Sequence, residues 1–201
     1  MSDLSSILEK AINGSIETLQ GLKRIEPQIE YAAKAIEQCL LSGNKLLVCG
    51  NGGSASDAAH FATELVVRFA KERRAYPAIC LTCDGGLLTA AGNDYGFEEI
   101  FARQLRAFGN ADDLLIAIST SGKSKNVQRA IKEARSRNLK TIALLGRDGG
   151  ISAGLSDVDL IVQGNSTARI QEAHKFILHV LCEIVDPRLC SLNVGHRAMR
   201  K

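Results

Sequence analysis

The sequence has no apolar run that approaches the roughly 20 residues needed for a membrane-spanning helix. Proline is scarce, with three residues in 201, and no Pro-rich or low-complexity stretch divides the chain. Near residue 1, acidic and basic residues are mixed into helical apolar spacing, which a signal peptide does not show. These absences predict a single cytoplasmic, soluble domain over residues 1–201, with no membrane partner.

Charge of one sign is not concentrated either. There are 25 basic and 22 acidic residues, for a net charge of +3. The exceptions are Lys71, Arg73 and Arg74 and the tail from Arg197 to Lys201, which are weak support for a nucleic-acid surface. We therefore expect no nucleic-acid partner, and the mild positive bias suits anionic metabolites.

The sequence also lacks the second Cys pair that a structural zinc site would require. Only Cys80 and Cys83 have a spacing typical of metal ligands. The six cysteines lie mostly in apolar runs without secretory context, so reduced core thiols are favoured over disulfides for all of them.

Hydrophobic periodicity predicts a helical N-terminal section over residues 1–42, with helices at 4–22 and 27–42, and a core over residues 43–186. In the core, short apolar runs alternate with helix-length segments, which is typical of an α/β fold with a doubly wound parallel sheet. The expected strands are 45–49, 78–82, 113–118, 140–145 and 158–162, and the expected core helices are 54–72, 97–108, 124–137 and 167–185. A tail over residues 187–201, beginning with Pro187, is predicted to be loosely held.

The segment from Cys49 to Glu64 joins a strand end, a glycine-rich turn and a helix. Exposed N–H groups in such a turn suit a phosphate, and Ser54 or Ser56 can cap the helix. His60 and Glu64 lie about one turn apart on one helix face, close enough to hold one substrate or one metal ion. The alternative is a polar pair on a solvated face.

In parallel sheets ligands bind at the carboxyl ends of the strands, which selects three loops here. The first is Gly50–Ser56, the second ends in Gly92–Gly96, and the third is Ser119–Ser124. The first loop also matches a weak dinucleotide fingerprint, but the expected acid about 20 residues onward is missing. Hydroxyls and a glycine make the third loop an anion nest, although a Ser-rich helix cap is the simpler alternative.

Two further pairs carry chemistry and have structural alternatives. Gln171 and His179 lie eight residues apart on the last predicted helix, so both can border one cleft, or both can be satisfied interior residues. Asn93 and Asp94, flanked by glycines, are typical turn residues.

Taken together, these residues resemble the sugar isomerase (SIS) domain family and, within it, the phosphoheptose isomerases. The resemblance rests on four segments in order: CGNGGSASDAAHFATEL (49–65), GNDYGFEEIF (92–101), ISTSGKSKNV (118–127) and ARIQEAHKFILHVLCEIVD (168–186). It implies a five-stranded parallel sheet flanked by helices, a homotetramer with active sites between subunits, and zinc-dependent ketose–aldose isomerisation. The implied substrate is sedoheptulose 7-phosphate, and the implied pathway supplies heptose for lipopolysaccharide or capsule synthesis.

The resemblance also implies the site residues. The phosphate would be held by Ser119, Thr120, Ser121 and Ser124. The sugar would contact Asn51, Gly52, Gly53, Glu64, Asn93, Asp94 and Gln171, with Ser54 close by. Glu64 and His179 would be the acid/base pair, and one zinc ion per subunit would be held by His60, Glu64, Gln171 and His179.

The chemistry supports this division of roles, because moving a carbonyl between C2 and C1 passes through an enediol. A carboxylate such as Glu64 can move the carbon-bound proton, and an imidazole such as His179 can move the proton between oxygens. The family also contains non-catalytic relatives, one of which binds a replication initiator and lacks parts of the acid/base set. A sugar-phosphate-binding or replication-linked regulatory protein is therefore the alternative, and the presence of His60, Glu64 and His179 favours the enzyme. The chain departs from the isomerase pattern at Lys123, at Ala168 and in its basic extension.

Overall fold

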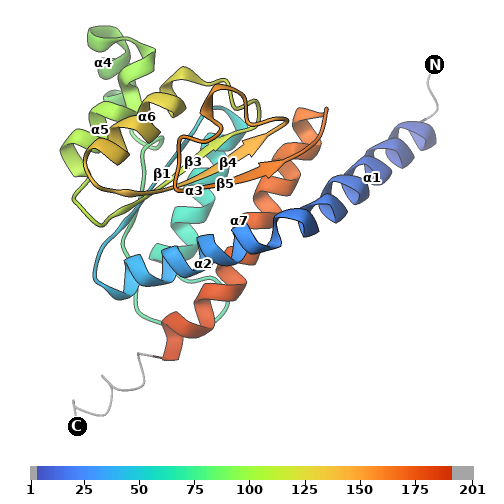
Figure 1. Ribbon diagram of the computed structural model, residues 1–201, viewed down its shortest axis with the longest axis horizontal. Coiled ribbons are helices and arrows are strands. Elements are labelled where there is room, and N and C mark those ends of the chain that lie inside the picture. Colours follow the sequence, from blue (N-terminus) through green and yellow to red (C-terminus); the bar gives the residue numbers. More distant parts are fainter. Residues whose placement is uncertain (1–3, 192–201) are drawn as a thin grey trace.

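The computed structural model describes residues 4–191 and contains one sheet of five parallel strands (Figure 1). The strands are β1 (Leu46–Gly50), β2 (Ala78–Cys80), β3 (Leu114–Ser119), β4 (Lys140–Gly146) and β5 (Val158–Val162), in the spatial order β2-β1-β3-β4-β5. In the central register, Leu46 lies opposite Ala78 on one side and Leu114 on the other. The predicted five-stranded parallel sheet is confirmed.

Helices cover both faces of this sheet, as the prediction of a doubly wound α/β fold required. They are α1 (Leu4–Gly21), α2 (Glu26–Leu41), α3 (Gly53–Val66), α4 (Gly85–Tyr95), α5 (Ile100–Phe108), α6 (Lys125–Ser136) and α7 (Thr167–Ser191), with short 3-10 helices at Leu22–Ile25, Phe97–Glu99 and Gly150–Ser152. Along β1, Leu46 and Val48 pack with α2, α3 and α7, whereas Leu47 and Cys49 pack with α4, α5 and α6. Because both faces are covered, the central strands are apolar at consecutive positions.

The strand order places the chain reversal between β1 and β3. From β1 the chain moves outward to β2, then returns to the other side of β1 to form β3, β4 and β5. The carboxyl ends of β1 and β3 therefore flank the topological switch point, where ligands bind in folds of this kind. The loops that leave these two ends are the glycine-rich and serine-rich loops that the sequence singled out.

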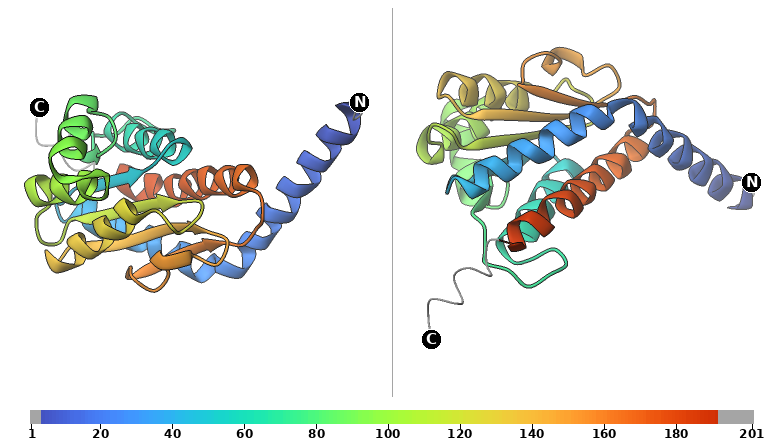
Figure 2. Two further views of the ribbon diagram at one scale, coloured as in Figure 1. Left: turned by 90° about the horizontal axis from the view of Figure 1, so that it is seen from above. Right: turned by 60° about the horizontal axis from the view of Figure 1, so that its bottom comes forward.

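The N-terminal helical section is confirmed, and its two helices differ in packing. Helix α2 lies against α7 and the sheet, while α1 extends away from the body of the molecule (Figure 2). The base of α1 is tied to α7 through Arg169, which donates to the Ala11 carbonyl at 2.8 Å and to the Ser15 hydroxyl at 2.8 Å. Leu19 packs against the core, whereas five large apolar side chains of α1 stay exposed: Leu4, Ile7, Leu8, Ile12 and Ile16.

Helix α4 was not predicted, because the stretch that ends in Gly92–Gly96 was interpreted as a loop. Its start is fixed by Asp84, whose carboxylate accepts a hydrogen bond from the Leu87 N–H at 2.9 Å. This N-cap satisfies a backbone donor that the helix itself cannot pair. Asn93 and Asp94 consequently lie in the last turn of a helix and not in a connecting loop.

Two helix ends also differ from prediction. Helix α3 stops at Val66 and not at residue 72, and α7 continues through Pro187 to Ser191. Proline in a helix removes one backbone hydrogen bond, but packing compensates here. Leu189 is buried and its carbonyl accepts from the Tyr76 hydroxyl at 2.9 Å. The prediction of a loosely held tail was therefore wrong for residues 187–191, and residues 192–201 lie outside the described part of the chain.

All six cysteines are free thiols, as expected, but only three are buried, and Cys80 and Cys190 are partly buried. Cys39, Cys49 and Cys182 are buried free thiols, and burial raises the pKa of Cys39 and of Cys182 to about 12. Cys83 is exposed, so its placement in the core was wrong. Among residues 4–191, no helix combines the length and the apolar character that crossing a bilayer demands.

His174, on the buried side of α7, should make stability depend on pH. Its ring is fully buried, and burial lowers the pKa of His174 from 6.5 to about 4. Between these values the unfolded state binds more protons than the folded state, so stability is complete above the unfolded pKa and declines as pH falls toward about 4. The expected loss is about 3 kcal/mol, measurable by urea unfolding at neutral pH and near pH 4.

The matched variant is His174→Met, which keeps an apolar side chain of similar reach. It should remove this part of the pH dependence while leaving the contribution of the carboxylates in place. An identical decline in wild type and variant would contradict the assignment to His174.

Candidate active site

The functional side chains lie on the facing surfaces of α3 and α7. Helical spacing places Gly53, Asp57, His60 and Glu64 along one face of α3, and Gln171, Lys175 and His179 along one face of α7. The contacts between the two helices follow the same order along α3 and α7: Gly53 with Gln171, Asp57 with Lys175, and His60 with His179. Residues more than 100 positions apart in sequence thus form one continuous surface.

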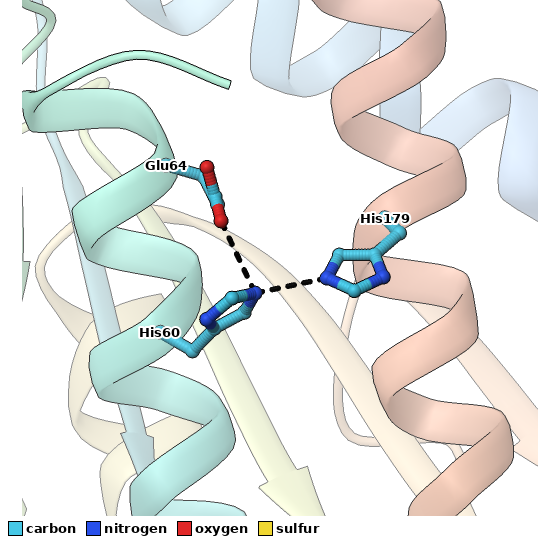
Figure 3. Close-up of side chains that lie close together, drawn as sticks. All are labelled: His60, Glu64 and His179. Carbon is cyan, nitrogen blue, oxygen red and sulfur yellow. Dashed lines mark hydrogen bonds and ion pairs between the residues drawn. The ribbon is translucent and has the colours of Figure 1, made fainter. Parts of the chain in front are cut away.

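Three proton-binding groups converge at the end of this surface (Figure 3). The Nε2 atoms of His60 and His179 lie 2.9 Å apart, and His60 Nε2 lies 3.2 Å from Glu64 Oε1. Each side chain is partly buried, and the ring of Phe69 lies against that of His179 at 6.1 Å between centroids. Glu64 and His179, the predicted acid/base residues, thus lie on either side of His60.

This cluster has the donor set of a divalent metal site. One ligand atom from each of His60, Glu64 and His179 lies within 4.8 Å of the others. Tetrahedral zinc with bonds of about 2.0–2.1 Å would separate neighbouring ligand atoms by about 3.3 Å, close to the two distances that His60 makes to His179 and to Glu64. Two imidazoles and one carboxylate with an open fourth position are also a ligand set used by catalytic zinc.

The glycine-rich loop leads directly into α3. Gly52 has a φ of 55° and is the N-cap residue, and no side chain caps this helix. The helix begins at Gly53, ahead of both serines, so the predicted capping by Ser54 or Ser56 was wrong. Ser54 is buried in the first turn. The N–H groups of Ser54 and Ala55 already donate to the Asn51 and Gly52 carbonyls at 3.0 Å each, so this helix N-terminus would attract a phosphate or a sugar oxygen through its dipole more than through free donors.

The serine-rich loop is ordered by its own hydroxyls. Ser119 Oγ accepts from the Gly122 N–H at 3.1 Å and lies 3.2 Å from Ser124 Oγ, and Ser121 Oγ accepts from the Lys123 N–H at 3.2 Å. Gly122 has a φ of 64°, and a side chain there would collide with the Gly149 carbonyl. Such a compact turn before α6 provides the N–H and hydroxyl groups expected of an anion nest.

A pair of amides links the two loops across the switch point. Asn51 donates to Asn126 Oδ1 at 2.8 Å, and Asn126 donates back to Asn51 Oδ1 at 2.8 Å. Asn126 is buried in the first turn of α6. The pair fixes the glycine-rich loop relative to the serine-rich loop.

The structure places Gln171 beside the glycine-rich loop but leaves Asn93 and Asp94 apart from the other predicted sugar-contacting residues. Gln171 lies against the backbone of Gly53, where an added Cβ would be 2.3 Å from Gln171 Nε2. Asn93 and Asp94 are exposed at the end of α4, and Asn93 donates to Asp94 at 2.9 Å. Within the described chain, no hydrogen bond joins this second pair to the other predicted site residues.

Sequence reasoning missed Asp57 and Asn126. Asp57 is 1% exposed, and its carboxylate lies 3.6 Å from Lys175 Nζ. Burial raises the pKa of Asp57, while Lys175, Gln171 and His60 oppose that shift. The available signal for Asp57 was its position one turn before His60 on the same helix face. Asn126 had no sequence signal beyond its place in the first turn after the serine-rich loop.

The fold is that of a SIS domain. The family model described as "SIS domain" matches residues 12–146 of the chain. A phosphoheptose isomerase from Citrifermentans bemidjiense is 52% identical over 171 residues, which cover 85% of this chain and 88% of that protein. One from Shewanella loihica is 48% identical over 186 residues, covering 90% of this chain and 94% of that protein.

Solved structures agree with the sequence comparison. The phosphoheptose isomerase from Neisseria gonorrhoeae superimposes with a TM-score of 0.86 at 43% identity, covering 92% of this chain and all of that chain. The chain belongs to the SIS domain family and, within it, to the phosphoheptose isomerases. The regulatory alternative is not favoured, because these relatives are phosphoheptose isomerases.

Proposed function

We propose that this protein is an isomerase that interconverts sedoheptulose 7-phosphate and D-glycero-D-manno-heptose 7-phosphate through an enediol. The observation that supports it most is the convergence of Glu64, His60 and His179 on facing helices. The two anion-binding loops of the same fold supply a place for the phosphate. The names of the relatives give the substrate class.

In the proposed mechanism, Glu64 takes the proton from C1 of the ketose and returns it to C2, while the carbonyl moves from C2 to C1. His179 moves a proton between the two oxygens, so the enediol forms and collapses without net loss of protons. Each of these acid/base contributions is worth about 10²- to 10⁴-fold in rate. His60 lies between the two groups and contacts both of them.

We propose one zinc ion per subunit, held by His60, Glu64 and His179, with Gln171 as a fourth ligand. Zinc bound there would polarise the substrate carbonyl and stabilise the developing oxyanion. Glutamine is an uncommon zinc ligand, and Gln171 lies against Gly53 in the structure, so its carboxamide would have to turn toward the cluster.

The first experiment is conversion of sedoheptulose 7-phosphate by purified protein, followed by NMR of the aldose product with chelator and with added zinc. Turnover that depends on zinc supports both the reaction and the metal. Equal turnover in both samples would retain the isomerase and remove zinc. No turnover by folded, zinc-loaded protein would contradict the proposed function.

We propose that the phosphate binds the serine-rich loop through Ser119, Thr120, Ser121 and Ser124. Ser121→Ala should therefore raise KM and leave kcat nearly unchanged, because the lost contact is made equally to bound substrate and transition state. A hydrogen bond to a charged group is worth about 1.5–3 kcal/mol, so KM should rise roughly 10- to 100-fold. Steady-state kinetics measure this, with Ser136→Ala, at the far end of α6, as the control. An unchanged KM would move the phosphate to another loop.

We propose that the sugar chain contacts Asn51, Gly52, Gly53, Glu64, Asn93, Asp94 and Gln171, with Ser54 beside them. Asn51 and Gln171 border the N-terminus of α3, where Gly52 leaves open space for a ligand and Gly53 is covered by Gln171. Asn93 and Asp94 are exposed on α4, so we place them at a subunit boundary. Asn93→Ala tests this, since an unchanged KM would remove α4 from the site.

We propose a homotetramer with active sites between subunits. The support is the exposed apolar stripe of α1 formed by Leu4, Ile7, Leu8, Ile12 and Ile16, since contiguous apolar surface of this kind marks interaction sites. Ile12→Lys should reduce the assembled mass in sedimentation analysis. Glu9→Lys, also on α1, changes the charge but not this stripe and should not. A monomeric wild-type protein would contradict the proposal.

We further propose a cytoplasmic enzyme that supplies heptose for lipopolysaccharide or capsule. The support is the phosphorylated substrate class of the relatives. Cell fractionation and analysis of surface polysaccharide after deletion of the gene test this, and unchanged heptose content would contradict it.

A further inference from the structure

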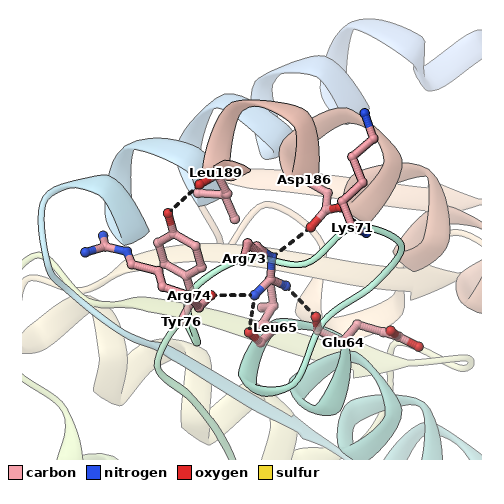
Figure 4. Close-up of polar contacts among 8 residues, drawn as sticks. All are labelled: Glu64, Leu65, Lys71, Arg73, Arg74, Tyr76, Asp186 and Leu189. Carbon is pink, nitrogen blue, oxygen red and sulfur yellow. Dashed lines mark hydrogen bonds and ion pairs between the residues drawn. The ribbon is translucent and has the colours of Figure 1, made fainter. Parts of the chain in front are cut away.

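A loop over residues 67–77, between α3 and β2, crosses the ends of α3 and α7 (Figure 4). It contains the basic residues Lys71, Arg73 and Arg74, which in sequence gave weak support for a nucleic-acid surface. Arg73 does not face solvent: its side chain is 1% exposed. A buried guanidinium requires partners for its donors, and all of those found here lie within the protein.

Arg73 donates to the carbonyl groups at the end of α3. Its Nη2 donates to the Glu64 carbonyl at 2.6 Å, and its Nη1 donates to the Leu65 carbonyl at 2.9 Å. The last carbonyls of a helix have no partner within the helix, and a cation near them also interacts favourably with the helix dipole. Arg73 therefore stabilises the final turn of α3, which is the turn that carries Glu64.

Asp186 holds the guanidinium in this position from α7. Arg73 Nε donates to Asp186 Oδ1 at 2.8 Å, and Asp186 is 5% exposed. Asp186 follows His179 by seven residues, two helical turns along the same face of α7. The Arg73–Asp186 ion pair thus connects the turn that carries Glu64 with the helix that carries His179.

The same loop reaches the acid/base pair at a second point. The ring of Phe69 lies 6.1 Å from that of His179, and Tyr76 N–H donates to the Leu65 carbonyl at 3.1 Å. One short segment therefore contacts both the last turn of α3 and the side chain of His179.

We propose that Arg73, held by Asp186, is a positioning residue that fixes Glu64 relative to His60 and His179. Without the guanidinium, the carbonyls of Glu64 and Leu65 lose buried donors, and the last turn of α3 opens. Glu64 then departs from the geometry in which it meets the substrate proton. This inference rests on the proposed isomerase function, because it assigns Arg73 to the support of the proposed base.

The test compares Arg73→Lys and Asp186→Asn with Lys45→Met. Lys45, just before β1, pairs with the buried carboxylate of Asp113, just before β3, at 2.5 Å. This pair lies at the same amino-terminal edge of the sheet, but its hydrogen bonds do not go to the carbonyl groups of α3. All three variants disrupt an ion pair with a buried carboxylate and should lower Tm. A small displacement of a catalytic group costs about 10²-fold, so kcat should fall roughly 10- to 100-fold for Arg73→Lys and Asp186→Asn, with KM within about threefold. Lys45→Met should keep kcat within about twofold at a temperature where every variant is folded.

Hydrogen exchange provides a readout that does not depend on turnover. Backbone amides of residues 64–69, in the last turn of α3 and the start of the following loop, should exchange faster in Arg73→Lys and Asp186→Asn than in the wild-type protein. In Lys45→Met their exchange rates should be unchanged. Faster exchange with wild-type kcat would overturn the positioning role, as would an equal loss of kcat in Lys45→Met. If the wild-type protein has no isomerase activity, the proposed function fails. Hydrogen exchange that is the same in Arg73→Lys, Asp186→Asn and the wild-type protein would separately show that Arg73 does not stabilise the last turn of α3.

Discussion

Glu64→Gln should abolish isomerisation while sparing the fold and the binding of substrate. The amide has the size of the carboxylate and can keep the contact with His60 at 3.2 Å, but it cannot accept a proton from carbon. The expected loss in kcat is about 10²- to 10⁴-fold, the range for removal of a general base. NMR of aldose formation measures turnover, and calorimetric titration with the substrate measures binding.

The control for this variant is Glu72→Gln, which makes the same chemical change at an exposed carboxylate in the loop after α3. It should leave both kcat and KM unchanged. A Glu64→Gln protein with substantial turnover would show that another group takes the proton, and His60 would then be the next candidate.

Gly53→Ala should change stability and activity in opposite directions. Alanine is favoured over glycine within a helix by about 0.5–1 kcal/mol, so the free energy of unfolding should be unchanged or higher. The added Cβ would, however, lie 2.3 Å from Gln171 Nε2 and 2.6 Å from its Cδ, so the flexible end of Gln171 must move away. Displacing a group in the site by about an ångström costs about 10²-fold in kcat/KM.

Gly85→Ala is the matched control, because Gly85 is also the first residue of a helix. A Cβ at Gly85 meets nothing within 4 Å, so this variant tests the helix effect without a steric one. The double variant Gly53→Ala/Gln171→Ala should be no worse than Gln171→Ala alone, since the carboxamide that the added methyl group displaces is then absent. Wild-type activity in Gly53→Ala would show that Gln171 makes no contact that turnover requires.

Both predictions depend on the facing surfaces of α3 and α7, which also show what the sequence could and could not reveal. Helical periodicity placed His60 and Glu64 on one face of α3, and Gln171 and His179 on one helix. Nothing in the local sequence indicated that His60 Nε2 would meet His179 Nε2, or that Gln171 would lie on Gly53. These contacts depend on how the two helices cross the same face of the sheet, which is a property of packing.

The errors have physical causes of the same kind. Glycines at 85 and 86 weakened the helical signal of α4, whereas the Asp84 cap and the packing of Ala91 stabilise the helix. Pro187 indicated the end of α7, but buried Leu189 and the Tyr76 hydrogen bond extend it. Arg73 belonged to a basic cluster in the sequence and is part of a buried ion pair in the fold.

The sequence by itself determined the α/β class and the five strands, and it singled out the glycine-rich loop, the serine-rich loop and the ionisable residues His60, Glu64 and His179. It did so because strand and helix periodicity, glycine-rich turns and ionisable side chains are local properties that neighbouring residues define. Tertiary structure alone decided which loops share the switch point, which helix faces meet, and that Arg73 anchors the turn of Glu64. Those features arise from contacts between residues far apart in sequence, whose geometry is set by the strand order β2-β1-β3-β4-β5 and by the two apolar layers that cover it.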